Sequence, residues 1–144
     1  PSENVERMMA RVVAFTLNAQ DRLQFSKGLD EPDDADIWLR DYDDSIKLWI
    51  DVGEPSADRL KRVGRLADTT KIYAFNSKAD TWWSQIANKV RDYKVEVYQF
   101  NNASIEALAA ITERTMQLSF TITGESAYIA GDAGDVEVTW SQLQ

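Results

Sequence analysis

Residues 46–55 read Ile-Lys-Leu-Trp-Ile-Asp-Val-Gly-Glu-Pro, and they contain the clearest strand signal in the chain. The residues at positions 46, 48, 50 and 52 are all apolar and share one face of an extended segment. Asp51 lies on the other face, beside Trp49. The Gly-Glu-Pro segment ends the strand, and Ser56 can cap a helix over residues 56–66. The stretch therefore predicts a strand, a tight turn and a helix that folds back over the sheet.

The segments after this unit repeat the same alternation of strand and helix. We predict strands over 71–75 and 94–100, and helices over 77–90 and 104–114. Single helices between strands indicate right-handed βαβ units and a parallel sheet. From residue 116 the pattern changes to short alternating runs separated by turns, which predicts antiparallel strands over 127–130 and 136–140.

The segments before this unit are less regular. Ser2 is placed to cap a helix with a buried face, and Leu23 and Phe25 indicate a short strand. Residues 30–44 hold eight carboxylates and a proline, a composition typical of a solvated loop, which the more apolar 36–39 interrupts. We predict one α/β domain over residues 1–144, with a mixed central sheet and flanking helices.

The composition excludes several kinds of chemistry. The 144 residues include no histidine and no cysteine, so histidine-based hydrolysis, histidine-bound zinc and catalytic thiols are ruled out. Any catalysis must use carboxylates, lysine, arginine, hydroxyls and a hard cation such as Mg²⁺ or Mn²⁺. No apolar run is long enough to span a bilayer. The net charge of −8 argues against broad, nonspecific binding to duplex DNA.

Two residues of the strand–turn–helix unit are candidates for chemistry. Asp51 is one residue from the end of its strand, where ligands gather in open parallel sheets. The alternative is an exposed acid or a cap for the next turn. Lys61 is on the following helix and could be brought near the end of the strand. Alternatively, Lys61 belongs to a solvated basic face of the helix together with Arg59, Arg62 and Arg65.

Motifs along essentially the whole chain resemble the YaeQ family of bacterial proteins. These motifs are Pro1-Ser2-Glu3, Arg7-Met8-Met9, Arg22-Leu23-Gln24-Phe25, Leu48-Trp49-Ile50-Asp51-Val52-Gly53 with Pro55, Arg59-Leu60-Lys61, Tyr73-Ala74-Phe75-Asn76-Ser77 and Arg114-Thr115-Met116. The family usually carries a further strand segment before the Pro-Ser-Glu motif, and we expect that segment to be absent here. A cytoplasmic location is also expected.

The resemblance implies a divergent PD-(D/E)XK nuclease-like fold, also called restriction-endonuclease-like. By this resemblance Glu3, Asp36 and Asp51 would hold Mg²⁺ or Mn²⁺, and Lys61 would orient the attacking water. The usual lysine position, two residues after Asp51, is Gly53, and the usual proline before the first strand acid is Ala35. The acids Asp33, Asp34, Asp41 and Asp43 are alternatives to Asp36.

Two functions follow from this resemblance. The first is a Mg²⁺-dependent phosphodiesterase that acts on nucleic acid through Glu3, Asp36, Asp51 and Lys61. The second is a catalytically inactive nuclease fold that binds a protein or a nucleic acid. The displaced lysine and the negative net charge favour the second, whereas the set of three acids favours the first.

Overall fold

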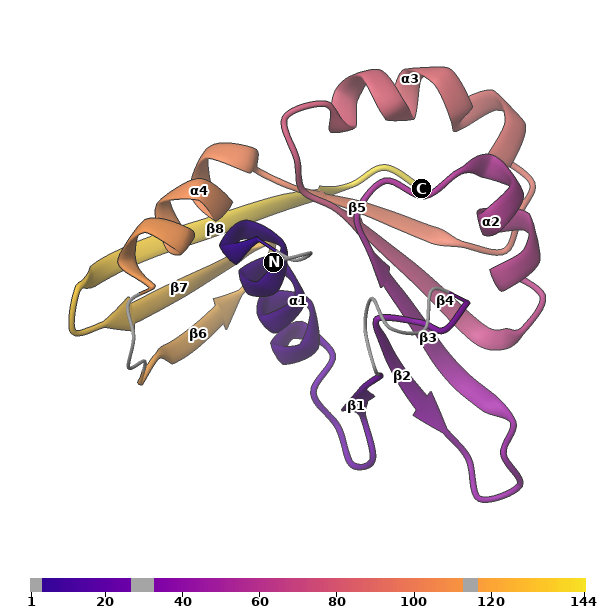
Figure 1. The fold of residues 1–144 in the computed structure, drawn as a ribbon, viewed down its shortest axis with the longest axis horizontal. Helices are drawn as coiled ribbons and strands as arrows, with labels where there is room; N and C mark the ends of the chain where they lie inside the picture. Colours follow the sequence, from indigo (N-terminus) through magenta and orange to yellow (C-terminus); the bar gives the residue numbers. More distant parts are fainter. Residues whose placement is uncertain (1–3, 27–32, 113–116) are drawn as a thin grey trace.

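The computed structural model describes residues 4–26, 33–112 and 117–144, which form a mixed α/β fold (Figure 1). The helices are α1 (Val5–Leu17), α2 (Ala57–Val63), α3 (Ala79–Val90) and α4 (Asn102–Ile111). The strands are β1 (Gln24–Phe25), β2 (Ile37–Arg40), β3 (Ile46–Val52), β4 (Ala67–Ala74), β5 (Glu96–Phe100), β6 (Ser119–Thr123), β7 (Ser126–Gly131) and β8 (Gly134–Gln142). Among these described helices, none combines the length and the apolar character that crossing a membrane requires.

The strands form one mixed sheet in the order β1-β2-β3-β4-β5-β8-β7-β6. Strands β3, β4 and β5 are parallel, as the alternation of strands and helices predicts. Strands β6, β7 and β8 are antiparallel, which confirms the change of pattern predicted after residue 116. The predicted α/β class with a mixed central sheet and flanking helices is therefore confirmed.

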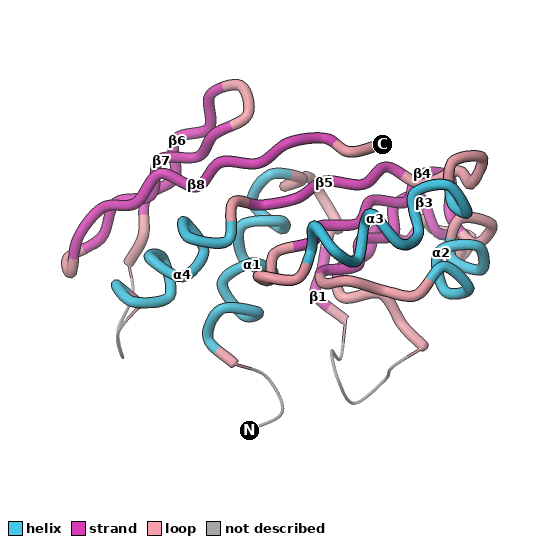
Figure 2. Tube along the Cα trace, turned by 90° about the horizontal axis from the view of Figure 1, so that it is seen from above, coloured by secondary structure: helices cyan, strands magenta, loops and turns pink. Residues whose placement is uncertain are grey.

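The two faces of the sheet are covered by different helices. Helices α1 and α4 pack together on one face, over a core that includes Met9, Ile50, Phe100 and Leu108. Helices α2 and α3 pack on the other face of the β3–β5 region (Figure 2). Because both faces of β3 are covered, Trp49 is almost fully buried and Asp51 is only 4% exposed.

Two predictions at the amino-terminal side need correction. Residues 37–40 of the acidic stretch were assigned to a loop, but they form β2, which pairs antiparallel with β3. A short apolar segment between acids is enough for a strand when a neighbouring strand supplies its hydrogen bonds. The cap of α1 is Asn4, whose side chain accepts a hydrogen bond from the backbone N–H of Arg7 at 2.8 Å. The predicted cap, Ser2, lies outside the described residues.

Candidate functional site

The pairing of β2 with β3 brings Asp36 and Asp51 together. Ile37 pairs with Ile50 and Trp38 with Trp49, so the same antiparallel register places Asp36 opposite Asp51. The backbone N–H of Asp36 donates to the carbonyl of Ile50 at 3.1 Å. Both aspartates therefore lie at the carboxyl edge of the parallel strands, which is the edge where open α/β sheets bind ligands.

Asp51 is held by the first turn of α2. Its Oδ2 accepts a hydrogen bond from Arg59 Nε at 2.7 Å, and its Oδ1 accepts from Arg59 Nη2 at 3.2 Å. The indole Nε1 of Trp49 also donates to Oδ1, at 3.0 Å. The hydrogen bond to Asp51 raises the pKa of Arg59, and burial opposes this effect only in part. This two-point contact fixes the plane of the Asp51 carboxylate.

Asp36 is held by α1. Arg7 Nη2 donates to Asp36 Oδ1 at 2.7 Å, and Arg11 Nε lies 3.8 Å from the same oxygen. Oδ2 of Asp36 accepts from the backbone N–H of Val52 at 2.7 Å, which extends the β2–β3 hydrogen bonding by one side chain. Burial raises the pKa of Asp36, and the negative charge of Asp51 raises it further; the Val52 N–H and Arg7 act in the opposite direction. The two carboxylates are thus close enough to repel each other.

Gly53 occupies the position where the nuclease-like pattern usually has a lysine. Its φ of +130° is in the region that favours glycine. A Cβ at this position would lie 3.2 Å from Arg7 Nη1, and the same guanidinium group donates to the carbonyl of Val52. A cation is therefore present beside position 53, but it comes from α1 rather than from β3.

We expect Gly53→Ala to lower the free energy of unfolding by about 1–3 kcal/mol, because it combines backbone strain with a close contact to Arg7. Urea denaturation monitored by tryptophan fluorescence measures the change. Gly134→Ala is the matched control, since Gly134 also has a large positive φ, of +145°, but a Cβ there would lie 3.4 Å from Ile111, an ordinary contact. Equal losses in the two variants would show that the Arg7 contact adds nothing.

Lys61 is placed differently from the prediction for it. It is exposed on α2, two residues after Arg59. Residues two apart on a helix point to different sides, so the side of α2 that faces Asp51 carries Arg59 instead. The sequence interpretation grouped Arg59 with the solvated basic face of this helix. One feature of the sequence could have distinguished Arg59 from Lys61. The apolar Leu60 lies between them, and in the structure it is fully buried on the side of the helix that meets the sheet.

The other acids of the predicted set are distributed as follows. Glu3 lies outside the described residues, so its role stays a prediction. Asp33 is almost fully exposed, with Arg62 at 3.9 Å, and Asp41 and Asp43 lie at the opposite end of β2, in the turn before β3. Of the acids in the stretch 33–44, Asp36 is the one that the structure places opposite Asp51.

Glu54 is a further acid at this edge that sequence reasoning treated only as part of a turn. Its Oε2 accepts hydrogen bonds from the backbone N–H groups of Phe75, at 2.8 Å, and Asn76, at 3.3 Å. The side-chain amide of Asn76 donates to Oε1. Glu54 therefore joins the end of β3 to the end of β4 and fixes the backbone that follows Asp51.

Two of the three predicted metal ligands, Asp36 and Asp51, lie at this edge. Mg²⁺ is commonly bound by one or two carboxylates together with water and substrate phosphates, and Asp36 and Asp51 provide two carboxylates side by side. Each oxygen has two lone pairs, and Asp36 Oδ2 accepts only the Val52 N–H among the described residues. Within those residues, no group of three or more acids, histidines or cysteines is arranged to hold a metal ion.

Fold and site together define a class: a mixed α/β domain with two buried, arginine-paired aspartates at the carboxyl edge of its sheet. The family model described as YaeQ protein matches residues 1–140, and the chain belongs to this family. The uncharacterized protein YaeQ of Escherichia coli (strain K12) is 34% identical over 146 residues, covering 100% of this chain and 81% of that protein. The Salmonella typhi protein of the same description is 33% identical over 147 residues, covering 99% of this chain and 81% of its own length.

Two crystal structures have the same fold. The YaeQ protein from Xanthomonas axonopodis pv. citri superimposes with a TM-score of 0.95 at 34% sequence identity, covering 100% of this chain and 82% of its own. The YaeQ protein from Pseudomonas syringae gives a TM-score of 0.93 at 29% identity, covering 100% of this chain and 80% of its own. The arrangement of strands around Asp36 and Asp51 is therefore an arrangement of the family fold.

Proposed function

We propose that this protein is a metal-dependent phosphodiesterase of the nuclease-like type, with a variant site built on Asp36 and Asp51. The observation that carries the proposal is the antiparallel pairing that places these two carboxylates opposite each other at the carboxyl edge of the sheet. Asp36 and Asp51 would hold Mg²⁺ or Mn²⁺, with Glu3 as a third ligand by family resemblance. The bound cation would supply positive charge against the negative charge that develops on a scissile phosphate.

The protein's own residues would position the substrate and balance the charges. Arg59 and Arg7 each hold one carboxylate, and guanidinium groups bind phosphate oxygens as readily as carboxylates. A phosphodiester at this edge would therefore meet two cations on opposite sides of the aspartate pair. Arg59, which is already aimed at Asp51, supports the proposal more directly than Lys61 does.

A second candidate function is phosphate or nucleic-acid binding without cleavage. The specific observation that favours it is that each aspartate already has an arginine at 2.7 Å, so the carboxylates can remain charged without a metal. In this alternative Arg7 and Arg59 would bind a phosphate of the ligand in place of an aspartate carboxylate. Asp36 and Asp51 would then only position the two arginines in the free protein.

Metal titration and cleavage assays distinguish the two. We expect calorimetry to show Mn²⁺ binding to the wild-type protein, and Asp51→Asn to weaken it more than about 100-fold, because even partners that merely orient metal ligands are worth 10–100-fold. Labelled single-stranded and duplex DNA and RNA, incubated with Mg²⁺ or Mn²⁺, test cleavage in parallel. Asp92→Asn is the control, since Asp92 is an exposed acid beyond the amino end of β5. Cleavage that survives in Asp51→Asn would reject the enzymatic proposal, and absence of metal binding at millimolar concentration would favour the binding protein.

A further inference from the structure

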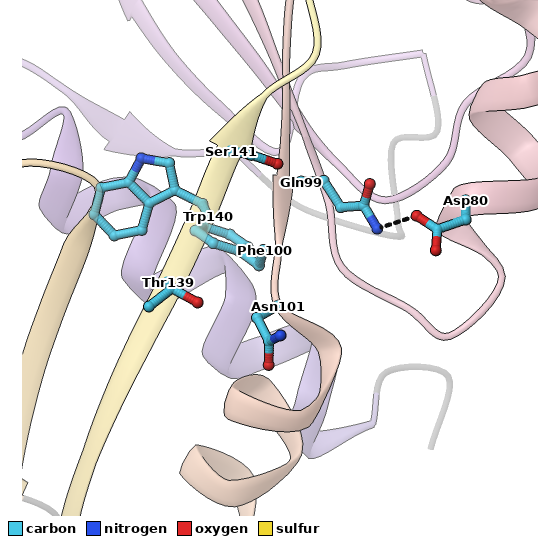
Figure 3. A pocket seen from close by; sticks show the side chains of 7 residues that line it. All are labelled: Asp80, Gln99, Phe100, Asn101, Thr139, Trp140 and Ser141. Carbon is cyan, nitrogen blue, oxygen red and sulfur yellow. Dashed lines mark hydrogen bonds between the residues drawn. The ribbon is translucent and has the colours of Figure 1, made fainter.

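A polar pocket lies along the same edge of the sheet, beyond the candidate site. It has a volume of about 300 Å³ and is lined by Asp80, Gln99, Phe100, Asn101, Thr139, Trp140 and Ser141 (Figure 3). Gln99 and Phe100 end β5, and they pair with Ser141 and Trp140 of β8. Asp80 belongs to the first turn of α3. The pocket is thus formed where α3 stops covering the sheet.

The pocket is lined by neutral hydrogen-bonding groups and one carboxylate. Gln99 Nε2 donates to Asp80 Oδ1 at 2.9 Å, an orientation that keeps the amide oxygen Oε1 as an acceptor (Figure 3). Asn101 Oδ1 accepts from the backbone N–H of Ser104, so its amide N–H₂ remains as a donor. The hydroxyls of Thr139 and Ser141 can act in either direction. Because no cation lines the pocket, it suits a neutral group rather than a phosphate.

A nucleobase has the matching chemistry. Its edge presents N–H donors beside carbonyl and ring-nitrogen acceptors, and amide side chains read such edges with paired hydrogen bonds. The volume is at the lower end of the range for small-ligand pockets, which a single base fits better than a larger cofactor. The base must also be unpaired, since the edge that faces the pocket is used for pairing in a duplex.

The pocket and Asp51 lie on the same face of the sheet, with the buried Ile72 and Val97 between them. Asp51 pairs with Ile72, and Ile72 pairs with Val97, so these residues share one face, and Gln99 follows Val97 on that face. Two strand spacings and two residues along β5 separate Asp51 from Gln99, roughly 12 Å. Trp82 Nε1 donates to the carbonyl of Pro55 at 2.7 Å, which holds the start of α3 between the two sites. A few nucleotides of a single strand span this distance.

We infer that this pocket binds one unpaired base of a single-stranded nucleic acid, a few nucleotides from the phosphate bound beside Asp36 and Asp51. The inference rests on the proposed function for the identity of the ligand. Gln99 and the hydroxyls of Thr139 and Ser141 would recognise the base. The charged residues around Asp36 and Asp51 would contact only the phosphate. The pocket would give the protein a base preference at one position of the strand.

The test uses the full chain and labelled oligonucleotides, measured by fluorescence anisotropy in EDTA so that nothing is cleaved. The strands are homopolymers of each base and one abasic strand, each made as DNA and as RNA. We expect the wild-type protein to prefer one base, and Gln99→Leu to lower affinity for that strand by about 5–100-fold, the discrimination that a paired amide–base contact gives. Ser141→Ala, at an exposed residue, should give a smaller loss of the same preference.

The controls separate this inference from the enzymatic proposal. Gln142→Leu is the matched control, because Gln142 is the next residue of β8, points to the other face and should not alter binding. Asp51→Asn should keep the base preference while losing metal-dependent cleavage. A base preference without any cleavage supports the pocket and rejects the enzyme. Equal affinity for all strands, an equal effect of Gln99→Leu on the abasic strand, or no binding of single strands overturns the pocket.

Discussion

Asp36→Ala is expected to lower the free energy of unfolding by roughly 3 kcal/mol, at the lower end of the cost of breaking a buried ion pair. The substitution removes the carboxylate that receives Arg7 at 2.7 Å, and it also removes the acceptor for the buried N–H of Val52. The lower end applies because the Arg7 side chain is 22% exposed and water can solvate it in part. Urea denaturation of the wild-type and variant proteins at pH 7 measures the difference.

Two further variants show which contact matters. Asp36→Asn keeps an oxygen for the Val52 N–H but removes the charge and the acceptor for Arg7, so we expect an intermediate loss of about 2 kcal/mol. Asp33→Ala is the matched control, since Asp33 is an almost fully exposed acid of the same stretch whose only ion pair among the described residues is at 3.9 Å. Its loss should stay below about 0.5 kcal/mol. A similar loss in Asp33→Ala and Asp36→Ala would contradict the role of Asp36.

The pH dependence of stability follows from the raised pKa of Asp36. Burial, the largest cause, makes the charged form less favourable in the folded state than in the unfolded chain, so the folded pKa lies above the ordinary value of 3.8. The stability that Asp36 contributes by this effect is fully present below pH 3.8 and is lost as the pH rises through the folded pKa. As the pH rises from 3.8 through the folded pKa, we expect the free energy of unfolding of the wild type to fall relative to that of Asp36→Asn, which has no titrating group at this position. A difference that moves the other way would mean that Arg7 outweighs burial.

The strand at 46–52 could be predicted from sequence because the periodicity of two and the Gly-Glu-Pro stop are local features. The strand at 37–40 could not, because its four residues stand among acids and its identity depends on hydrogen bonds to β3 across the turn at 41–45, which the acidic composition hides. The pairing of Asp36 with Asp51 depends on that same register. Periodicity therefore located one aspartate, and only the family resemblance suggested the other.

The cations of the site show a second limit of sequence reasoning. Arg59 and Lys61 are two residues apart in one basic cluster, and composition alone treats them alike. What separates them is the direction in which α2 packs, which is set by Leu60 and Val63 against the sheet. Arg7 is 44 residues away from Asp51 along the chain, so no local pattern could place its guanidinium beside Gly53.

Arg59→Met is expected to lower metal-dependent cleavage by about 10²–10³-fold, the usual cost of removing a group that stabilises charge in the transition state. Methionine keeps much of the apolar contact with Trp49, whose ring lies 5.9 Å from the guanidinium, and removes only the charge and its hydrogen bonds. The same substitution releases both oxygens of Asp51 from Arg59, so we expect Mn²⁺ affinity to rise while turnover falls. A residue that merely supported the fold would weaken both.

Lys61→Met completes this comparison, because the family resemblance would assign the catalytic cation to Lys61, whereas our proposal assigns it to Arg59. With Lys61 exposed and on another side of α2, we expect its loss to reduce cleavage less than about threefold, within the weak screened effect of a surface charge. Single-turnover cleavage rates at saturating Mn²⁺ give the comparison directly. A larger loss at Lys61 than at Arg59 would return the role to the lysine, and α2 would then have to rotate by about half a turn when substrate binds, since residues two apart are separated by roughly 200°.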